Sequence, residues 1–444
     1  MSSDYALPSS TPLERDTRLV STDHKIAPSE IAIGVVIGRT SEFFDFFTYG
    51  IASVLVFPKV FFPFVDPLRA TLYSFAVFAL AFIARPIGSV IFMAIDRRHG
   101  RGVKLTIALF LLGGSTAAIS FLPNYAHLGA ASVVLLAAFR IGQGLALGGA
   151  WDGLASLLAL NAPENRRGWY AMMPQLGAPL GFMLASALFS FFLVNLTSED
   201  FLDWGWRYPF YVAFAINVVA LFARLRLVGT DEFSALLEKQ ELAAVPVLEV
   251  IRVHGRHIMI GAFVPLASFA LFHLVTVFPI SWITLFTQRS AGEFLMVQFA
   301  GALIGAGAIV ASGLIADQIG RRTLVGISAA LIGVFALGSI IAPILFGDSE
   351  VGQTIYVVVG FGLLGLSYGQ TAGAVSSNFD NRYRYTGSAL TSDLAWFVGA
   401  GFAPLVALSL SSRFGLAWVG VYLLSGAVAT LSALALNKRF MREA

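Results

Sequence analysis

The chain contains no cysteine, only six histidines and few charged residues. The absence of cysteine excludes disulfides, iron–sulfur clusters and thiolate metal sites. Six histidines are a poor basis for a structural metal, so we predict neither a metal nor a cofactor. Only 12% of the residues are charged, against about 25% in soluble domains. This scarcity of charge argues against a soluble globular protein.

Apolar residues dominate instead, at 57% of the chain with a mean hydropathy of +0.78. Most of them fall in apolar segments long enough to cross a bilayer as helices. Residues 1–30 are polar and carry no cleavable signal peptide, so we expect the first membrane helix to be the targeting signal. We predict an all-α polytopic membrane protein with twelve transmembrane helices, at residues 31–57, 70–95, 103–122, 130–158, 168–193, 207–226, 257–286, 294–316, 323–345, 353–377, 386–410 and 414–437.

Lysine and arginine gather in alternate connections, such as 97–104, 166–167 and 321–322. Because cytoplasmic loops carry the excess of positive charge, this distribution predicts that both termini lie in the cytosol. The pI near 9.1 therefore reflects membrane topology and not a nucleic-acid partner.

The chain divides into two similar halves. A basic turn with Asp96 and Arg97 follows the second segment, and one with Asp317 and Arg321 follows the eighth. We predict a tail at 1–30, six-helix bundles at 31–226 and 257–437, and a second tail at 438–444. Between the bundles, the linker 227–256 carries apolar residues spaced as in an amphipathic helix, namely Phe233, Leu236 and Leu237. Two such repeats around a substrate cavity describe a major facilitator fold.

The first apolar segment contains three charged residues, Arg39, Glu42 and Asp45. Each charge at the centre of a bilayer costs about 2.5–3.5 kcal/mol on insertion scales. The spacing of three residues places them along one side of a helix. They must therefore face the protein interior, pair with one another or change their protonation state.

Several motifs together resemble the metabolite:proton symporter branch of the major facilitator superfamily, which includes citrate, 2-oxoglutarate, shikimate and proline/betaine carriers. The resemblance spans nearly the whole chain. It rests on Glu-Phe-Phe-Asp-Phe-Phe at 42–47, Arg-Pro-Ile-Gly at 85–88, Pro-Gln-Leu-Gly-Ala-Pro at 174–179, Trp-Gly-Trp-Arg at 204–207 and Arg-Tyr-Thr-Gly at 384–387.

The chain departs from this branch at three places. Ala150 stands where the family has glutamate, and a carboxylate follows instead at Asp152. In the basic turn of the first half, Arg97 stands where the family has aspartate, and Met93 where it has glycine. Asp393 occupies a position where an amide is expected.

The resemblance implies that Asp45 and Arg140 form the proton-coupling pair. Burial favours the protonated form of a carboxyl group, and a neighbouring guanidinium favours the ionised form. Proton binding and anion binding at such a pair would promote each other. The alternative is a permanent ion pair that only holds two helices together.

The remaining intramembrane charges have two interpretations each. Glu42 is a structural partner of Arg39 or Arg85, or a further proton site. Arg39 binds the substrate anion, since a guanidinium suits a carboxylate, or only pairs with Glu42. Asp152 and Asp393 are alternative proton sites or water-accessible gate residues.

Other polar and aromatic residues within the segments are candidates for substrate contacts, although such residues often only pack. With Arg39 and Arg140, we name Tyr49, Gln143, Gln175, His273, Trp282, Tyr368, Gln370 and Trp396. By resemblance, the basic turns form a cytosolic gate; their alternative role is topology alone. The candidate gate residues are Asp96, Arg97, Arg101, Asp317, Arg321 and Arg322.

The sequence favours a proton-coupled importer of a small organic anion over an enzyme, since it holds no phosphate-binding loop or nucleophile motif. By resemblance we expect a monomer in the bacterial inner membrane. Two alternatives remain open: a carrier of a zwitterionic osmolyte such as proline or betaine, and a transporter-like receptor that signals without transport.

Overall fold

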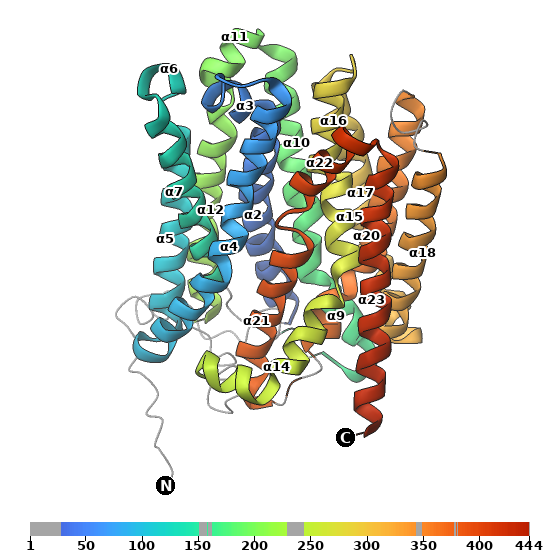
Figure 1. The fold of residues 1–444 in the computed structure, drawn as a ribbon. Helices are drawn as coiled ribbons and strands as arrows, with labels where there is room; N and C mark the ends of the chain where they lie inside the picture. The colour runs from blue at the N-terminus through green and yellow to red at the C-terminus, as the bar shows by residue number, and fades with distance from the viewer. Residues whose placement is uncertain are drawn as a thin grey trace.

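The computed structural model describes residues 28–150, 158, 162–228, 244–342, 349–376, 379 and 381–443. Over these ranges the chain is almost entirely helical (Figure 1). The long helices of the first half are α2 (Pro28–Leu55), α4 (Pro67–His99), α5 (Arg101–Ser120), α7 (Ala130–Gly149), α10 (Gly177–Asn195) and α12 (Arg207–Val228). Those of the second half are α14 (Val247–Phe263), α15 (Leu266–Val275), α16 (Val277–Phe286), α17 (Ala291–Ile319), α18 (Arg321–Ile341), α20 (Glu350–Ser376), α21 (Asn381–Gly399), α22 (Ala403–Phe414) and α23 (Ala417–Glu443).

Short helices lie at the ends of the long ones. They are α3 (Phe57–Phe61), α6 (Tyr125–Leu128), η1 (Glu164–Arg166), α9 (Arg167–Met172), η2 (Met173–Leu176), α11 (Ser198–Asp200) and η3 (Phe201–Gly205). Within the described ranges, ten helical stretches are long and apolar enough to cross a membrane. The helices α2, with its three internal charges, and α12 complete the twelve predicted segments. The all-α membrane fold predicted from hydropathy is thus confirmed.

Several predicted segments are broken helices. The stretch predicted at 257–286 is α14, α15 and α16 in succession, and α14 already begins at Val247 because its first turns are amphipathic and escape a hydropathy search. The break at Thr276 frees backbone carbonyls inside the bundle. Gln298 of α17 donates to the carbonyls of Val275 and Thr276, each at 2.7 Å, which replaces the lost helical bonds.

The helices of each half pack mainly on one another. The main contacts between the halves join α2 with α16, α4 with α21, and α17 with both α9 and α10, and smaller ones include α20 with α9 and α22 with α4. The start of α2 and the end of α23 lie at the same end of the bundle (Figure 1). We call this the terminal end. The predicted linker helix around residues 233–237 lies outside the described residues.

Aromatic side chains fill the space between the halves. Phe43 and Phe47 of α2 contact Phe272 of α15, with ring centroids 6.0 and 5.3 Å apart. Phe46 contacts Trp396 of α21 at 6.2 Å. These rings surround the charged residues of α2, so the candidate site lies at the junction of the two halves.

Candidate functional site

The close packing of α4 against α7 fixes the floor of the site. A Cβ atom added at Gly144 would lie 2.3 Å from the Ala81 carbonyl oxygen, and one at Gly148 2.3 Å from that of Arg85. Only glycine permits this approach, as expected of small residues at membrane helix interfaces. The glycines of α7 therefore set where α4 presents Arg85 and the residues that follow it.

Glu42 pairs with Arg39 in the same helix, with 2.6 Å between Nη1 and Oε2. Of the two partners predicted for Glu42, the structure records Arg39, and it pairs Arg85 with a different acid. Arg39 also lies over the Phe43 ring, with its guanidinium carbon 5.2 Å from the centroid. Arg39 also interacts with Tyr368 of α20, in the second half.

Asp45 is buried in a network of the first half. One carboxylate oxygen accepts from the Thr116 hydroxyl of α5 at 2.5 Å. The other is 3.5 Å from the side-chain amide nitrogen of Gln143, which also donates to Thr116 at 2.8 Å. The expected direct ion pair with Arg140 does not form between these two described residues. Gln143 lies between them, and its oxygen accepts from Arg140 at 3.0 Å.

Arg140 is 1% exposed and is held mainly by neutral groups. Its Nε donates to the Phe78 carbonyl at 3.2 Å. The guanidinium carbon lies 3.8 Å from the Tyr49 ring centroid and 4.7 Å from that of Phe78. A cation in this position gains from the aromatic faces, but none of the acids in the described ranges forms an ion pair with it.

Three buried polar groups around this point lack a hydrogen-bond partner among the described residues. They are Nη2 of Arg140, the hydroxyl of Tyr49 and both ring nitrogens of His273. The His273 ring lies 5.6 Å from Phe78, which also contacts Arg140. Since buried polar groups in native proteins are almost always hydrogen-bonded, this cluster has unused capacity for a polar ligand.

A cavity of about 40 Å³ adjoins the cluster. This volume holds a few water molecules and is far below the roughly 300–1,000 Å³ of typical ligand pockets. In the described conformation this cavity is therefore too small for a ligand of that size. The cavity is lined by Arg39, Glu42, Phe43, Phe46, Ala81, Phe82, Arg85, Arg140, Leu147, Ala150 and Trp396.

An ion pair joins the two halves beside this cavity. Nε of Arg85 on α4 lies 2.7 Å from Oδ1 of Asp393 on α21. The side chains are 13% and 4% exposed. Oδ2 of Asp393 accepts from the Ser89 hydroxyl, one turn along α4 from Arg85. The position where the sequence departs from its family thus carries a buried charge that contacts the opposite half.

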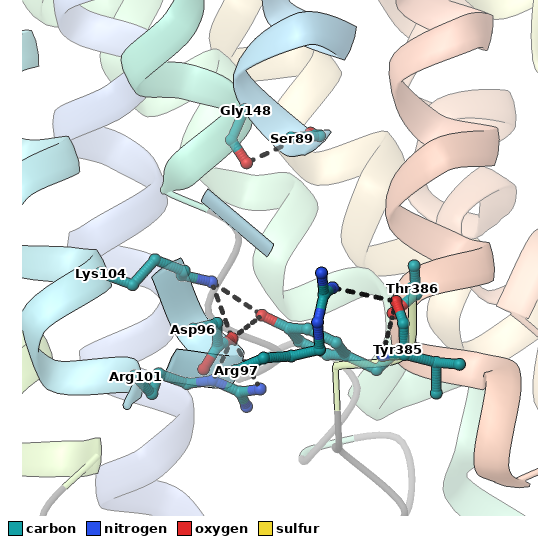
Figure 2. Close-up of polar contacts among 9 residues, drawn as sticks. Ser89, Asp96, Arg97, Arg101, Lys104, Gly148, Tyr385 and Thr386 are labelled. Atoms are coloured by element: carbon teal, nitrogen blue, oxygen red, sulfur yellow. Dashed lines mark hydrogen bonds and ion pairs between the residues drawn. The ribbon is translucent and has the colours of Figure 1, made fainter. Parts of the chain in front are cut away.

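A second polar cluster lies further toward the terminal end (Figure 2). Asp96 contacts Arg101 at 3.1 Å and Lys104 at 3.5 Å, all within the first half. The Tyr385 hydroxyl of α21 accepts from Lys104 at 2.8 Å, and the Arg101 guanidinium carbon lies 4.1 Å from its ring centroid. Sequence reasoning missed Lys104 and Tyr385, although both lie in motifs it singled out.

The predicted gate residue Arg97 reaches the second half differently. Its Nη1 lies 3.5 Å from the carbonyl of Val245, just before α14. The backbone N–H of Val245 in turn donates to the Thr386 hydroxyl at 3.0 Å (Figure 2). Arg97, at a position where the resembling branch has aspartate, therefore contacts the segment that leads into α14.

Asp317, at the end of α17, caps a helix of the other half. Its carboxylate accepts from the backbone N–H groups of Gly168 and Trp169 at 2.6 and 3.2 Å. A carboxylate at a helix N-terminus satisfies free N–H groups and the helix dipole. Gln370 adds a bond to the Gly168 carbonyl at 3.1 Å.

The other candidates lie in varied surroundings. Arg321 is within electrostatic range of Asp317 and of Arg167 in the first half, whereas Arg322 bonds the Leu434 carbonyl in its own half. Tyr368 packs on Phe43 and Phe272. Gln175 is buried in η2, and the indole N–H of Trp282 has no partner among the described residues. Asp152 lies outside the described residues.

Comparisons with known proteins agree with one another. The sequence model of the Major Facilitator Superfamily matches residues 35–400. The inner membrane metabolite transport protein YhjE of Escherichia coli is 37% identical over 92% of this chain and 94% of its own length. The shikimate transporter of the same organism is 31% identical over 93% and 94%. The crystal structure of a D-xylose–proton symporter superposes with a TM-score of 0.68 over 90% of this chain and 97% of that one, at 18% identity.

Proposed function

Because the chain belongs to the Major Facilitator Superfamily, we propose that it imports a small organic anion together with protons by alternating access. This membership confirms the resemblance that the motifs indicated, and its relatives and fold are those of transporters and not of enzymes. We propose further that the protein is a monomer in the bacterial inner membrane and that it needs no cofactor. Its terminal end faces the cytosol, which agrees with the basic connections.

One observation carries the proposal of an anionic substrate. Arg140 is buried, and one of its N–H groups has no partner among the described residues; the same holds for the Tyr49 hydroxyl and the His273 ring nitrogens. A carboxylate accepts several hydrogen bonds and binds guanidinium groups strongly. A substrate carboxylate at this point would therefore satisfy donors that the described residues leave without a partner.

Asp45 is placed to couple a proton to this binding. It reaches Arg140 only through Gln143, so the two charges offset each other without being locked together. When a proton neutralises Asp45, the Arg140 charge has less compensation and an anion is favoured. The reverse effect follows by linkage, since the two ligands must help each other equally.

Uptake into proteoliposomes with an imposed inward proton gradient tests the proposal. We would compare labelled citrate, 2-oxoglutarate, shikimate, an aromatic carboxylate, proline and betaine. We expect a carboxylate to accumulate, and a protonophore to abolish its accumulation. Accumulation of proline or betaine alone would refute the role of Arg140 as an anion ligand. Flux without response to the proton gradient would refute the coupling, and binding without any flux would indicate a receptor.

A further inference from the structure

The intramembrane acids differ in whether their partners lie in the same half. Glu42 pairs with Arg39 inside α2. Asp45 contacts Thr116 and Gln143, which belong to α5 and α7 of its own half. Asp393 alone, among the described intramembrane acids, forms an ion pair with the opposite half, through Arg85. When two rigid halves rock apart, contacts inside each half persist and only contacts between them change.

We infer that Asp393 is a proton-binding site that controls opening of the terminal end. Ionised and paired with Arg85, it holds the halves together; when it is protonated, the pair is released. This inference rests on the proposed function and adds to it a second proton site, distinct from Asp45. The proton that binds Asp393 from the cavity leaves it when the terminal end has opened.

The position of the pair suits this role. Along α4, Arg85 lines the cavity, Ser89 follows by one turn, and Asp96 lies two turns further toward the terminal end. The pair therefore separates the cavity from the Asp96 cluster. A substrate carboxylate in the cavity can reach Arg85, which already lines it.

Charge balance makes proton and anion act together. If Asp393 were protonated alone, Arg85 would remain largely buried without a counter-ion. If an anion bound Arg85 alone, Asp393 would remain a buried charge with Ser89 as its contact. Either state is unfavourable, because a buried ion that loses its partner is strongly destabilised. A proton on Asp393 and an anion on Arg85 together replace the pair without leaving an unpaired charge.

Ser89 can accommodate both protonation states of Asp393. Its hydroxyl oxygen contacts Asp393 and also lies 3.2 Å from the carbonyl oxygen of Gly148. A hydroxyl has one proton and two lone pairs. With Asp393 ionised, Ser89 donates to the carboxylate; with Asp393 protonated, it accepts that proton's hydrogen bond and donates to Gly148.

Other titratable groups lie near α21, but none has a recorded polar contact with Asp393 in the described ranges. From α14, Glu249 and His254 meet α21 about three turns away, at Arg382 and Tyr383. From the remaining neighbouring elements, the groups that face this region are Arg39 and Glu42 of α2, Asp96, Arg101 and Lys104 near Tyr385, His273 of α15 and Tyr368 of α20.

The cysteine-free chain offers a direct test. Ala150→Cys places one thiol on the cavity wall, at the end of α7. We would label it from the terminal side with an impermeant thiol reagent and normalise to denatured protein at each pH. At saturating transported substrate, acidification should raise labelling about five- to tenfold. When Asp393→Asn is combined with Ala150→Cys, the thiol should be labelled rapidly at every pH, since the asparagine amide cannot titrate.

Three further variants separate loss of the acid at position 393 from other effects on labelling. Asp393→Glu should restore a pH dependence, since it keeps the acid. Glu249→Gln removes an ion-paired acid within the second half and should behave as the parent. Asp45→Asn should lose accumulation but keep pH-dependent labelling. An unchanged pH profile in Asp393→Asn, or an equal loss of it in Glu249→Gln, would overturn the inference. Proton-driven uptake by the parent is measured separately, so failure here leaves the proposed function standing.

Discussion

Asp45 and Asp393 are both buried acids near an arginine, yet they are held in different ways. Asp45 is bonded to a hydroxyl and an amide of its own half, and Gln143 separates it from Arg140. Asp393 contacts Arg85 directly, across the interface between the halves. A proton on Asp45 would change the charge of the binding site, whereas a proton on Asp393 would change the contact that closes the molecule.

This difference separates two requirements of a coupled transporter. One site must make substrate binding depend on proton binding. Another must make opening of the terminal end depend on both the proton and the substrate. Asp45 reaches Arg140 only through Gln143, whereas the ion pair of Asp393 and Arg85 bridges the halves. Substitutions can therefore alter the two requirements one at a time.

Asp45→Asn should abolish concentrative uptake, lowering proton-driven accumulation by about tenfold or more, while exchange continues. Asparagine keeps an acceptor for the Thr116 hydroxyl, loses the one that faces the Gln143 amide nitrogen, and cannot take up a proton. Proton-driven uptake and counterflow in the same proteoliposomes measure the two activities. Asp66→Asn, at the exposed start of α4, serves as control. Accumulation by Asp45→Asn equal to the parent would refute coupling at this site.

Arg140→Lys should raise the KM for the transported anion by about tenfold or more, because losing a hydrogen bond to a charged group costs about 1.5–3 kcal/mol. Lysine keeps the charge but not the planar donor set that meets Phe78 and Gln143. Arg39→Lys should have a smaller effect, since Arg39 is already paired with Glu42. Initial rates against substrate concentration give both values; equal effects would contradict the assignment of the anion to Arg140.

Asp317→Asn should loosen the terminal end by about 1 kcal/mol, the usual value of a helix cap. Asparagine retains one of the two acceptors for the N–H groups of Gly168 and Trp169 and loses the charge. Labelling of Ala150→Cys from that side should rise about fivefold and keep its pH dependence. Asp200→Asn, exposed at the opposite end, should leave labelling unchanged, and no rise in Asp317→Asn would contradict its role in closure.

Gly148→Ala should destabilise the fold by about 1–3 kcal/mol, because overpacking forces backbones apart. The added Cβ would lie 2.3 Å from the Arg85 carbonyl oxygen and 2.5 Å from the Ser89 nitrogen. Thermal unfolding in detergent measures the loss. Gly114→Ala is the matched control, since nothing lies within 4 Å of its new Cβ. Equal midpoints for the two variants would show that this approach does not position Arg85.

Much of the fold was predictable because membrane helices must be long and apolar. Hydropathy located all twelve segments and the motifs indicated the family. The break at Thr276 was not predictable, since Gln298, twenty-two residues away, satisfies the freed carbonyls. The first turns of α14, before residue 257, escaped the hydropathy search because they are amphipathic and carry charged residues.

The sequence predicted several residues of the site but not the contacts among them. The sequence named Asp45, Arg140 and Gln143, but the order in which they connect depends on side-chain directions within packed helices. It noted Asp393 as a departure, yet Arg85 is 308 positions away and no local pattern links them. The partners Ser89 and Thr116 gave no signal, because single hydroxyls are common in membrane helices.

The most direct measurement follows protons themselves. Proteoliposomes holding the parent protein, with a weakly buffered medium and no imposed gradient, would be given the transported carboxylate. The account predicts that the medium becomes alkaline as substrate enters, and that Asp45→Asn exchanges substrate without this change. Substrate entry by the parent with no movement of protons would contradict it.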